Sequence, residues 1–249
     1  MQIQAGLKDP FAQVAWPRLD YVVKGIKKVE AEKGVASWTR LPITRSILQK
    51  LQEVWSTSSK CCAFDRKMLW AACCLGFFGF LRVGEMTAPI DATYDASVHL
   101  SISDIAVDNS RSPAVVRVTV KASKTDPFRK GVQLYLGKTG TTVCPVTAMV
   151  SYLCVRGMSS GALFRFSDGR LLTRQRFVEA LRTGLEKVNV PQDQYCGHIL
   201  RIGAATTAAA KGLEDSIIKT LGRWESVAYL QYVKILRQQL AGYSRLLVS

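Results

Sequence analysis

The residues best suited to chemistry lie close together near the C-terminus, between positions 198 and 232. His198 and Arg201 are three residues apart, so on a helix they would share one face and could hold one substrate group together. A short turn then carries Arg223 and Trp224, and Tyr232 follows it. A histidine and an arginine that grip the same group favour an anion, so we expect an anionic substrate.

Two further candidate motifs lie well upstream. Arg82 ends the apolar stretch Gly-Phe-Phe-Gly-Phe-Leu-Arg and is followed three residues later by Glu85. An arginine at the end of an apolar helix can also simply offset the partial negative charge of that helix end, and Glu85 can be an ordinary salt-bridge partner. Lys124 stands in Ala-Ser-Lys-Thr-Asp-Pro, where the alternative is a solvated turn rich in lysine. Each motif on its own is therefore ambiguous.

Taken in chain order, these motifs resemble the catalytic half of the tyrosine recombinases, the phage integrase family. Four motifs between residues 78 and 232 carry the resemblance: those of Arg82 and Lys124, His-x-x-Arg, and Leu-Gly-x-Trp with a tyrosine shortly after it. The sequences Phe-Leu-Arg-Val-Gly-Glu-Met-Thr and Leu-Gly-Arg-Trp-Glu-Ser are similar to those in recombinases of eukaryotic mobile elements of the Crypton and DIRS type. The resemblance therefore implies a site-specific DNA recombinase or integrase.

The resemblance also implies a role for each residue. Arg82 and Arg201 would stabilise charge on the phosphate, because each guanidinium offers a fork of donors and stays charged. Lys124 would protonate the leaving 5′ oxygen, and His198 would orient the phosphate or help to remove the tyrosine proton. Tyr232 would form a 3′-phosphotyrosine. No cofactor is implied, neither a metal, a nucleotide nor ATP.

Two assignments stay open in the sequence. Tyr232 fits the family spacing better than Tyr229, which could be a supporting aromatic. The second His or Trp of the family would fall on Arg223 at the usual spacing, whereas the side chain of the right type is Trp224. We favour Trp224, with a loop that absorbs one residue, over Arg223 in that role.

The composition fits a folded protein with a polyanionic partner. A chain of 249 residues with 48% hydrophobic and 21% charged residues can bury one large core or two modest ones. The net charge of +15 favours DNA, RNA or an acidic membrane surface. The longest apolar run, residues 68–81, is too short to span a bilayer, and the N-terminus lacks the apolar core of a signal peptide. We expect an intracellular protein, located in the nucleus, with double-stranded DNA rather than a membrane as its partner.

Metal binding is not expected. The chain has seven cysteines and two histidines, and the vicinal pairs Cys61-Cys62 and Cys73-Cys74 lack the spacing of zinc ligands. Reduced thiols, mostly packed in the core, are the expected state.

Hydrophobic periodicity predicts mostly helices. The expected helices cover residues 18–34, 45–55 with Thr44 as N-cap, 65–81, 145–156 closed by Gly157, and a stretch that Thr173 caps and that runs to about residue 188. Short helical segments follow from His198 onward. Alternating patterns predict strands at 98–102, 115–120 and 132–136, the last two joined through residues 121–131. The predicted fold class is mainly α with a small antiparallel β-sheet (α+β), the catalytic fold that the resemblance implies.

The chain is expected to divide near residue 38. Residues 1–38 would hold a remnant helix of an N-terminal DNA-clamping region and a linker, or simply a helix packed on the main domain. Residues 39–249 would form the catalytic domain. The tail at 233–248 could fold on its own domain, whereas the resemblance implies that it docks into a neighbouring subunit, which would give homo-oligomers (a dimer or tetramer) on DNA.

Basic residues outside the catalytic set are expected to contact the DNA backbone. Residues 111–138 hold seven Lys or Arg against one acid, and a further basic group starts the helix after residue 173. The candidates are Lys121, Arg129, Lys130, Arg174 and Arg176. Two other functions fit the same residues: a catalytically inactive, recombinase-like DNA-binding module, or DNA relaxation like that of type IB topoisomerases.

Overall fold

The computed structural model describes residues 42–58, 61–90, 94–108, 112–123, 126, 128–190, 198–224 and 230. All of them belong to one compact unit, Arg40–Ser249. The helix expected at 18–34, the boundary near residue 38 and the C-terminal tail lie outside the described residues and stay predictions. Within the described part, no helix is both long and apolar enough to cross a membrane.

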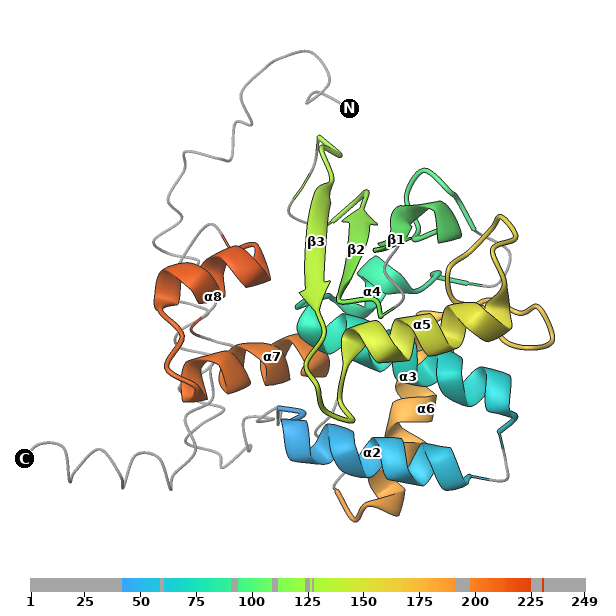
Figure 1. Ribbon diagram of the computed structural model, residues 1–249, viewed down its shortest axis with the longest axis horizontal. Helices are drawn as coiled ribbons and strands as arrows, with labels where there is room; N and C mark the ends of the chain where they lie inside the picture. The colour runs from blue at the N-terminus through green and yellow to red at the C-terminus, as the bar shows by residue number, and fades with distance from the viewer. Residues whose placement is uncertain are drawn as a thin grey trace, which may run out of the picture. The chain divides into compact units, whose positions relative to one another are not determined.

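The described residues form a helical part with a small sheet on one side of it (Figure 1). The helices are α2 (Arg45–Thr57), α3 (Ala63–Phe78), α4 (Val83–Met86), α5 (Pro145–Arg156), α6 (Arg174–Lys187), α7 (Ile199–Ala210) and α8 (Asp215–Gly222), with a short 3-10 helix, η2 (Ile102–Asp104). The strands are β1 (Ile105–Val107), β2 (Val115–Val120) and β3 (Val132–Gly137). The predicted fold class, mainly α with a small antiparallel sheet, is confirmed.

The sheet is antiparallel, with β2 between β1 and β3. The predicted hairpin is confirmed, since β2 and β3 are joined through residues 121–131. The strand predicted at 98–102 is wrong, because the chain turns there and β1 begins only at Ile105. The carboxylate of Asp104 accepts hydrogen bonds from the backbone N (2.7 Å) and the Oγ (2.6 Å) of Ser101. These bonds stabilise the 3-10 turn at the expense of an extended backbone.

Several predicted helix ends are confirmed by their caps. Thr44 Oγ1 accepts a hydrogen bond from Ile47 N (3.4 Å) at the start of α2, and Thr173 Oγ1 accepts one from Arg176 N (3.3 Å) at the start of α6. Helix α5 ends at Arg156, and its C-cap is Gly157, whose positive φ of 72° favours glycine.

Helix α3 lies at the centre of the packing and contacts α2, α5 and α7. Its side chains are buried along most of its length, as in a helix that is covered on all sides. The prediction that it continues to residue 81 is wrong, because it ends at Phe78. Gly79 caps it, and Phe80 follows with a φ of 50°. The chain therefore leaves α3 in a tight turn that points backbone carbonyls toward α7.

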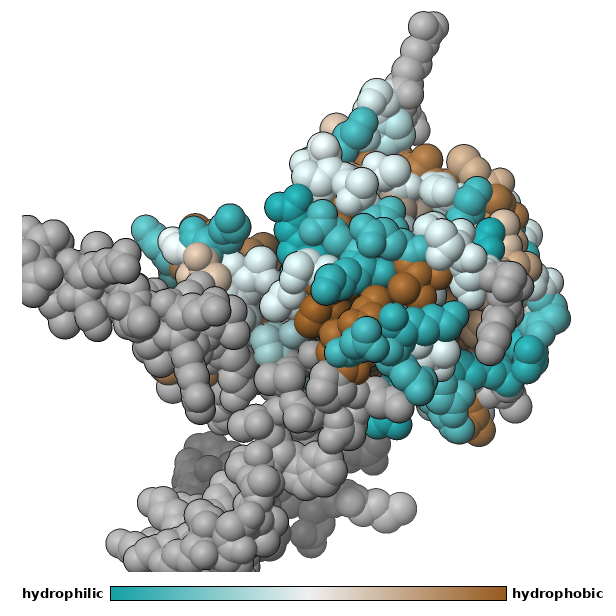
Figure 2. Space-filling model, turned by 90° about the horizontal axis from the view of Figure 1, so that it is seen from below, coloured by the Kyte–Doolittle hydropathy of each residue, from teal (hydrophilic) through white to brown (hydrophobic). Residues whose placement is uncertain are grey.

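The cysteines agree in part with expectation, and apolar side chains also lie on the surface. The six described cysteines are all free thiols, but only Cys73, Cys74 and Cys144 are buried. On one face of the molecule, hydrophobic surface is bordered by hydrophilic side chains (Figure 2). Apolar groups in the described residues are therefore not confined to the core.

Gly203 in α7 permits a close approach of two backbones. A Cβ at this position would overlap the carbonyl oxygen of Ile43. We expect Gly203→Ala to lower the free energy of unfolding by about 1–3 kcal/mol, because a backbone segment must shift to make room. The measurement is urea unfolding, with Gly84→Ala as the control, since a Cβ at Gly84 meets no atom within 4 Å. Equal stability of the two variants would contradict the prediction.

Candidate active site

Three segments that are distant in the sequence meet at the C-terminal end of α3. Arg201 of α7 donates from Nη1 to the carbonyl oxygen of Phe80 at 2.9 Å, although the two residues are 121 positions apart. Arg223, directly after α8, donates from Nη1 to the carbonyl oxygen of Gly79 at 3.0 Å, across 144 positions. The turn that ends α3 thus positions two arginines from the C-terminal part of the chain.

Glu85 lies between two of the arginines. Its Oε1 is 2.9 Å from Arg82 Nη1, and its Oε2 is 3.0 Å from Arg223 Nη2. Oε2 also accepts a hydrogen bond from the backbone N of Arg82 at 2.9 Å. The carboxylate is only 4% exposed, so it is held away from water between its cationic partners. The expected Arg82–Glu85 pair is therefore present, and Arg223 is a second partner.

Arg82 does not cap the C-terminal end of a helix. Helix α3 ends four residues before it, and Arg82 instead precedes the short helix α4. The alternative role, offsetting the charge at the end of the apolar helix, is therefore wrong. Its side chain is 17% exposed, and Glu85 is the one described residue to which the guanidinium is bonded. As far as the described residues go, its other donors are open to a ligand.

Arg201 is completely buried. Besides Phe80, its guanidinium donates from Nη2 to the carbonyl oxygen of Gly222. Its Cζ lies 4.4 Å from the ring centroid of Trp224, close enough for a cation–π interaction. Trp224 also meets Phe80 edge to face, with the ring centroids 6.2 Å apart. Trp224 therefore packs over the guanidinium of Arg201, which has no exposure to solvent.

A left-handed residue at the end of α8 directs Arg223 and Trp224 to different partners. Arg223 has φ 55° and ψ 47°, and Trp224 N donates to the carbonyl oxygen of Lys219 at 3.0 Å. A Cβ at Gly222 would overlap the indole ring, so glycine is what allows Trp224 to fold back. Burial lowers the pKa of Arg223, Glu85 opposes that shift and Arg82 adds to it. An arginine nevertheless remains a cation in proteins.

The remaining predicted catalytic residues are only partly described. His198 is the N-cap of α7 and half-buried, three residues before Arg201. Lys124, Tyr229 and Tyr232 lie outside the described residues, so their proposed roles stay predictions.

The predicted DNA-binding residues lie in different environments. Arg129, Lys130 and Arg174 are exposed. The Nζ of Lys121 is 2.6 Å from Asp104 Oδ2 and donates to Ser101 Oγ at 3.1 Å. This lysine is therefore engaged within the protein.

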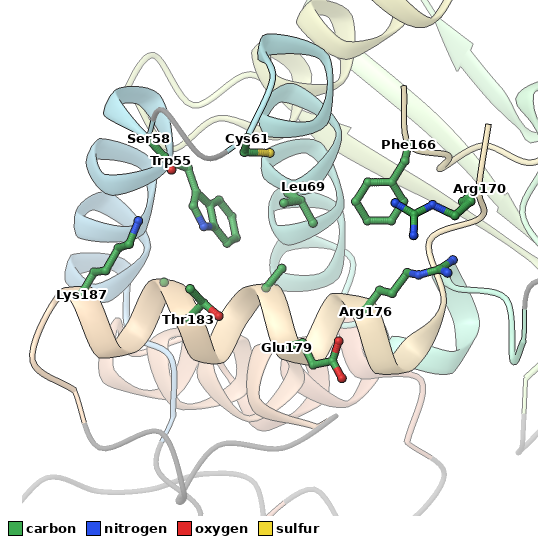
Figure 3. A pocket seen from close by; sticks show the side chains of 12 residues that line it. Trp55, Ser58, Cys61, Leu69, Phe166, Arg170, Arg176, Glu179, Thr183 and Lys187 are labelled. Atoms are coloured by element: carbon green, nitrogen blue, oxygen red, sulfur yellow. The ribbon is translucent and has the colours of Figure 1, made fainter. Parts of the chain in front are cut away.

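Arg176 lines a cavity of about 430 Å³ between α2, α3 and α6 (Figure 3). It donates from Nη1 to the carbonyl oxygen of Leu171 at 3.1 Å, and its Cζ lies 6.0 Å from the ring centroid of Phe166. Trp55 and Leu69 also line the cavity. Since Leu69 lies in the first half of α3, this cavity is separate from the arginine cluster.

No family model and no curated protein matches the chain at the level of sequence. Its fold, however, is similar to solved structures of recombinases. The XerH site-specific recombinase bound to palindromic difH substrate aligns with a TM-score of 0.61 at 15% identity, over 84% of this chain and 53% of that chain. The XerA recombinase aligns at 0.56 and 17%, over 84% and 64%.

A Flpe mutant in a complex with a DNA Holliday junction aligns at 0.52 and 14% identity, over 94% of this chain and 58% of that chain. The chain thus spans between half and two thirds of the length of these recombinases. At such identities the likeness shows the fold alone. The described residues have the fold of the tyrosine recombinase catalytic domain.

Proposed function

We propose that the chain is the catalytic domain of a tyrosine recombinase, which cuts and rejoins DNA strands through a 3′-phosphotyrosine at Tyr232. The observation that carries this proposal is the meeting of Arg82, Arg201 and Arg223 beside the C-terminal end of α3 on that fold, with Arg82 and Arg223 paired to one buried carboxylate, Glu85. Residues from such distant segments gather where a fold positions a site.

The charge of the cluster suits a phosphate. Three guanidinium groups and one carboxylate leave a formal excess of two positive charges. The transition state of phosphodiester transfer carries more negative charge on its non-bridging oxygens than the ground state does. Donors that are already in place stabilise that charge without further reorganisation. The cluster therefore favours the transition state over bound DNA in its ground state.

Arg82 and Arg223 are the best-placed phosphate ligands. Both side chains are slightly exposed, at 17% and 15%, and Glu85 fixes one edge of each. Arg223 has a polar contact with this carboxylate, whereas the face of the Trp224 ring packs on Arg201. We therefore assign Arg223, rather than Trp224, to the position of the second His or Trp of the family. Arg201 would join the turn after α3 to the end of α8 through Phe80 and Gly222. It would reach the phosphate only if Trp224 moved.

The proposed reaction exchanges one phosphoester bond for another. Tyr232 Oη attacks the scissile phosphorus, and the bond from phosphorus to the 5′ oxygen breaks. Lys124 supplies the proton to this oxygen, and His198 assists removal of the phenol proton. Because a phenol has a pKa near 10, the nearby cations are needed to lower the cost of forming the phenolate. Since a phosphoester is retained, the step can be reversed onto another strand.

Covalent capture tests the proposal. The chain is incubated with a pool of duplexes that have a randomised centre and a nick, so that cleavage releases a short strand and cannot be reversed. We expect a protein–DNA adduct that survives denaturation, with the DNA linked to Tyr232 by peptide mapping. DNA binding without any adduct would refute the proposed activity.

One observation favours a second function, an inactive DNA-binding module. Arg201 is completely buried, and both of its Nη atoms donate to backbone carbonyls. A site in which this arginine serves the fold alone would lack one charge for catalysis. The capture experiment separates the two functions, because a module of this kind retains DNA but leaves no adduct.

Under either function, DNA affinity is expected to fall steeply with salt, because phosphate contacts release counterions. If four phosphates are contacted, affinity drops by roughly 100-fold between 50 and 200 mM salt. Fluorescence anisotropy with a labelled duplex measures this slope. An affinity independent of salt would argue against a surface that binds phosphates.

Three further proposals follow from the same resemblance. They are integration of a mobile genetic element, assembly into dimers or tetramers on DNA through the C-terminal tail, and action in the nucleus.

A further inference from the structure

The connection between β2 and β3 carries an aromatic side chain that is turned to solvent. Phe128 is 82% exposed, the highest value among the large hydrophobic residues described, ahead of Met158 at 70%. A phenyl ring in this position contributes little to the core. Since its exposure to water is unfavourable, a ligand that covers it would gain binding energy.

The backbone around Phe128 is braced. The carboxylate of Asp126 accepts hydrogen bonds from the backbone N of Lys130 (3.1 Å) and of Gly131 (2.8 Å). The carbonyl oxygen of Asp126 accepts another from Arg129 N at 3.2 Å. Gly131 has a φ of 69°, a conformation that favours glycine. Hydrogen bonds thus hold the backbone on the C-terminal side of Phe128, whose ring is exposed.

Two exposed cations directly follow the ring, Arg129 and Lys130. A protein partner that covered Phe128 would have to desolvate or neutralise these charges. Duplex DNA can cover the ring, because its bases offer aromatic faces. It can also neutralise the two cations, because its phosphates lie beside each base step. The combination therefore favours DNA over an apolar protein surface.

We propose that Phe128 is a wedge that inserts between two base pairs of duplex DNA, while Arg129 and Lys130 bind the neighbouring phosphates. The inference rests on the proposed function in one respect, that DNA is the partner. It adds a direct contact to the bases, whereas the arginine cluster contacts only phosphate. Insertion unstacks one base step, and it therefore unwinds or kinks the duplex at that place.

Loss of the ring should weaken DNA binding. Stacking of one base on an aromatic side chain corresponds to about 5- to 150-fold in affinity, and this is the upper limit of the decrease expected for Phe128→Ala, because the cost of unstacking the base step is regained when the ring is lost. Phe128→Trp should retain the affinity, since it keeps an aromatic face. Tyr135→Ala is the matched control, because Tyr135 is an exposed aromatic on β3, away from the turn. Equal decreases in DNA affinity for Phe128→Ala and Tyr135→Ala would overturn the proposal that Phe128 is a wedge.

A topological assay tests insertion itself and needs no known target sequence. A nicked circular plasmid is sealed by DNA ligase with the full chain bound, in a Tyr232→Phe background so that the protein does not cut. After the protein is removed, we expect negatively supercoiled topoisomers, and a clearly smaller shift for Phe128→Ala at equal occupancy. Identical topoisomers for the two chains at equal occupancy would overturn the proposal.

The same experiments separate this inference from the proposed function. If the unsubstituted chain does not bind DNA even at low salt, both proposals fail. If it binds DNA and forms the tyrosine adduct, but Phe128→Ala changes neither affinity nor topology, only the wedge fails.

Discussion

Tyr232→Phe is expected to abolish the covalent protein–DNA adduct and to leave DNA affinity unchanged. The substitution removes one hydroxyl, the proposed nucleophile, and keeps a ring of the same shape. No other group in the proposed scheme can attack phosphorus in its place. The amount of adduct formed on the nicked duplex pool, resolved on a denaturing gel, measures the effect.

Tyr229→Phe is the matched control, because Tyr229 is the other tyrosine of the same segment. It should form adducts at the normal level. An adduct that survives Tyr232→Phe and disappears in Tyr229→Phe would identify Tyr229 as the nucleophile. An adduct that survives both would refute a tyrosine of this segment as the nucleophile.

The ends of the helices could be predicted because they depend on nearby residues. Thr44 and Thr173 each bond to a backbone N three residues on, and Gly157 adopts a conformation that other residues rarely do. The strand predicted at 98–102 failed because side-chain bonds competed with the alternating pattern. Ser101 and Asp104 close a tight turn there. The periodicity of the side chains does not report such local competition.

From local spacing, only part of the site could be predicted, whereas a shared role for Arg82 and Arg201 was implied by the resemblance alone. Arg82 and Glu85 are three residues apart, so their ion pair follows from the chain itself. The second partner of Glu85 is 138 residues away and depends on the packing of α7 on α3 and of α8 on α7. The sequence favoured Trp224 over Arg223 for the position of the family's second His or Trp, and that choice stays a prediction. What the sequence did not indicate is the left-handed backbone at Arg223, which directs the guanidinium to Glu85 and places the indole over Arg201.

Arg201→Ala is expected to lower the free energy of unfolding by about 2–4 kcal/mol, measured by urea unfolding without DNA. The substitution leaves the buried carbonyl oxygen of Gly222 without this donor and removes the cation that Trp224 covers. Phe80 is affected less, because its carbonyl oxygen also accepts from Arg223 Nη2 at 3.4 Å. An arginine that served only catalysis would cost little stability when removed.

Arg201→Lys separates the role in the fold from the role of the charge. A lysine keeps the positive charge, but its ammonium cannot reproduce the planar fork that joins Phe80 to Gly222 or stack in the same way on the indole. We expect a stability between those of the unsubstituted chain and Arg201→Ala. If Arg201→Lys is as stable as the unsubstituted chain, the planar guanidinium is not needed to keep Trp224 and the end of α8 in place. A full loss of adduct in a stable Arg201→Lys chain would then assign this arginine to the phosphate, and Trp224 would have to move when DNA binds.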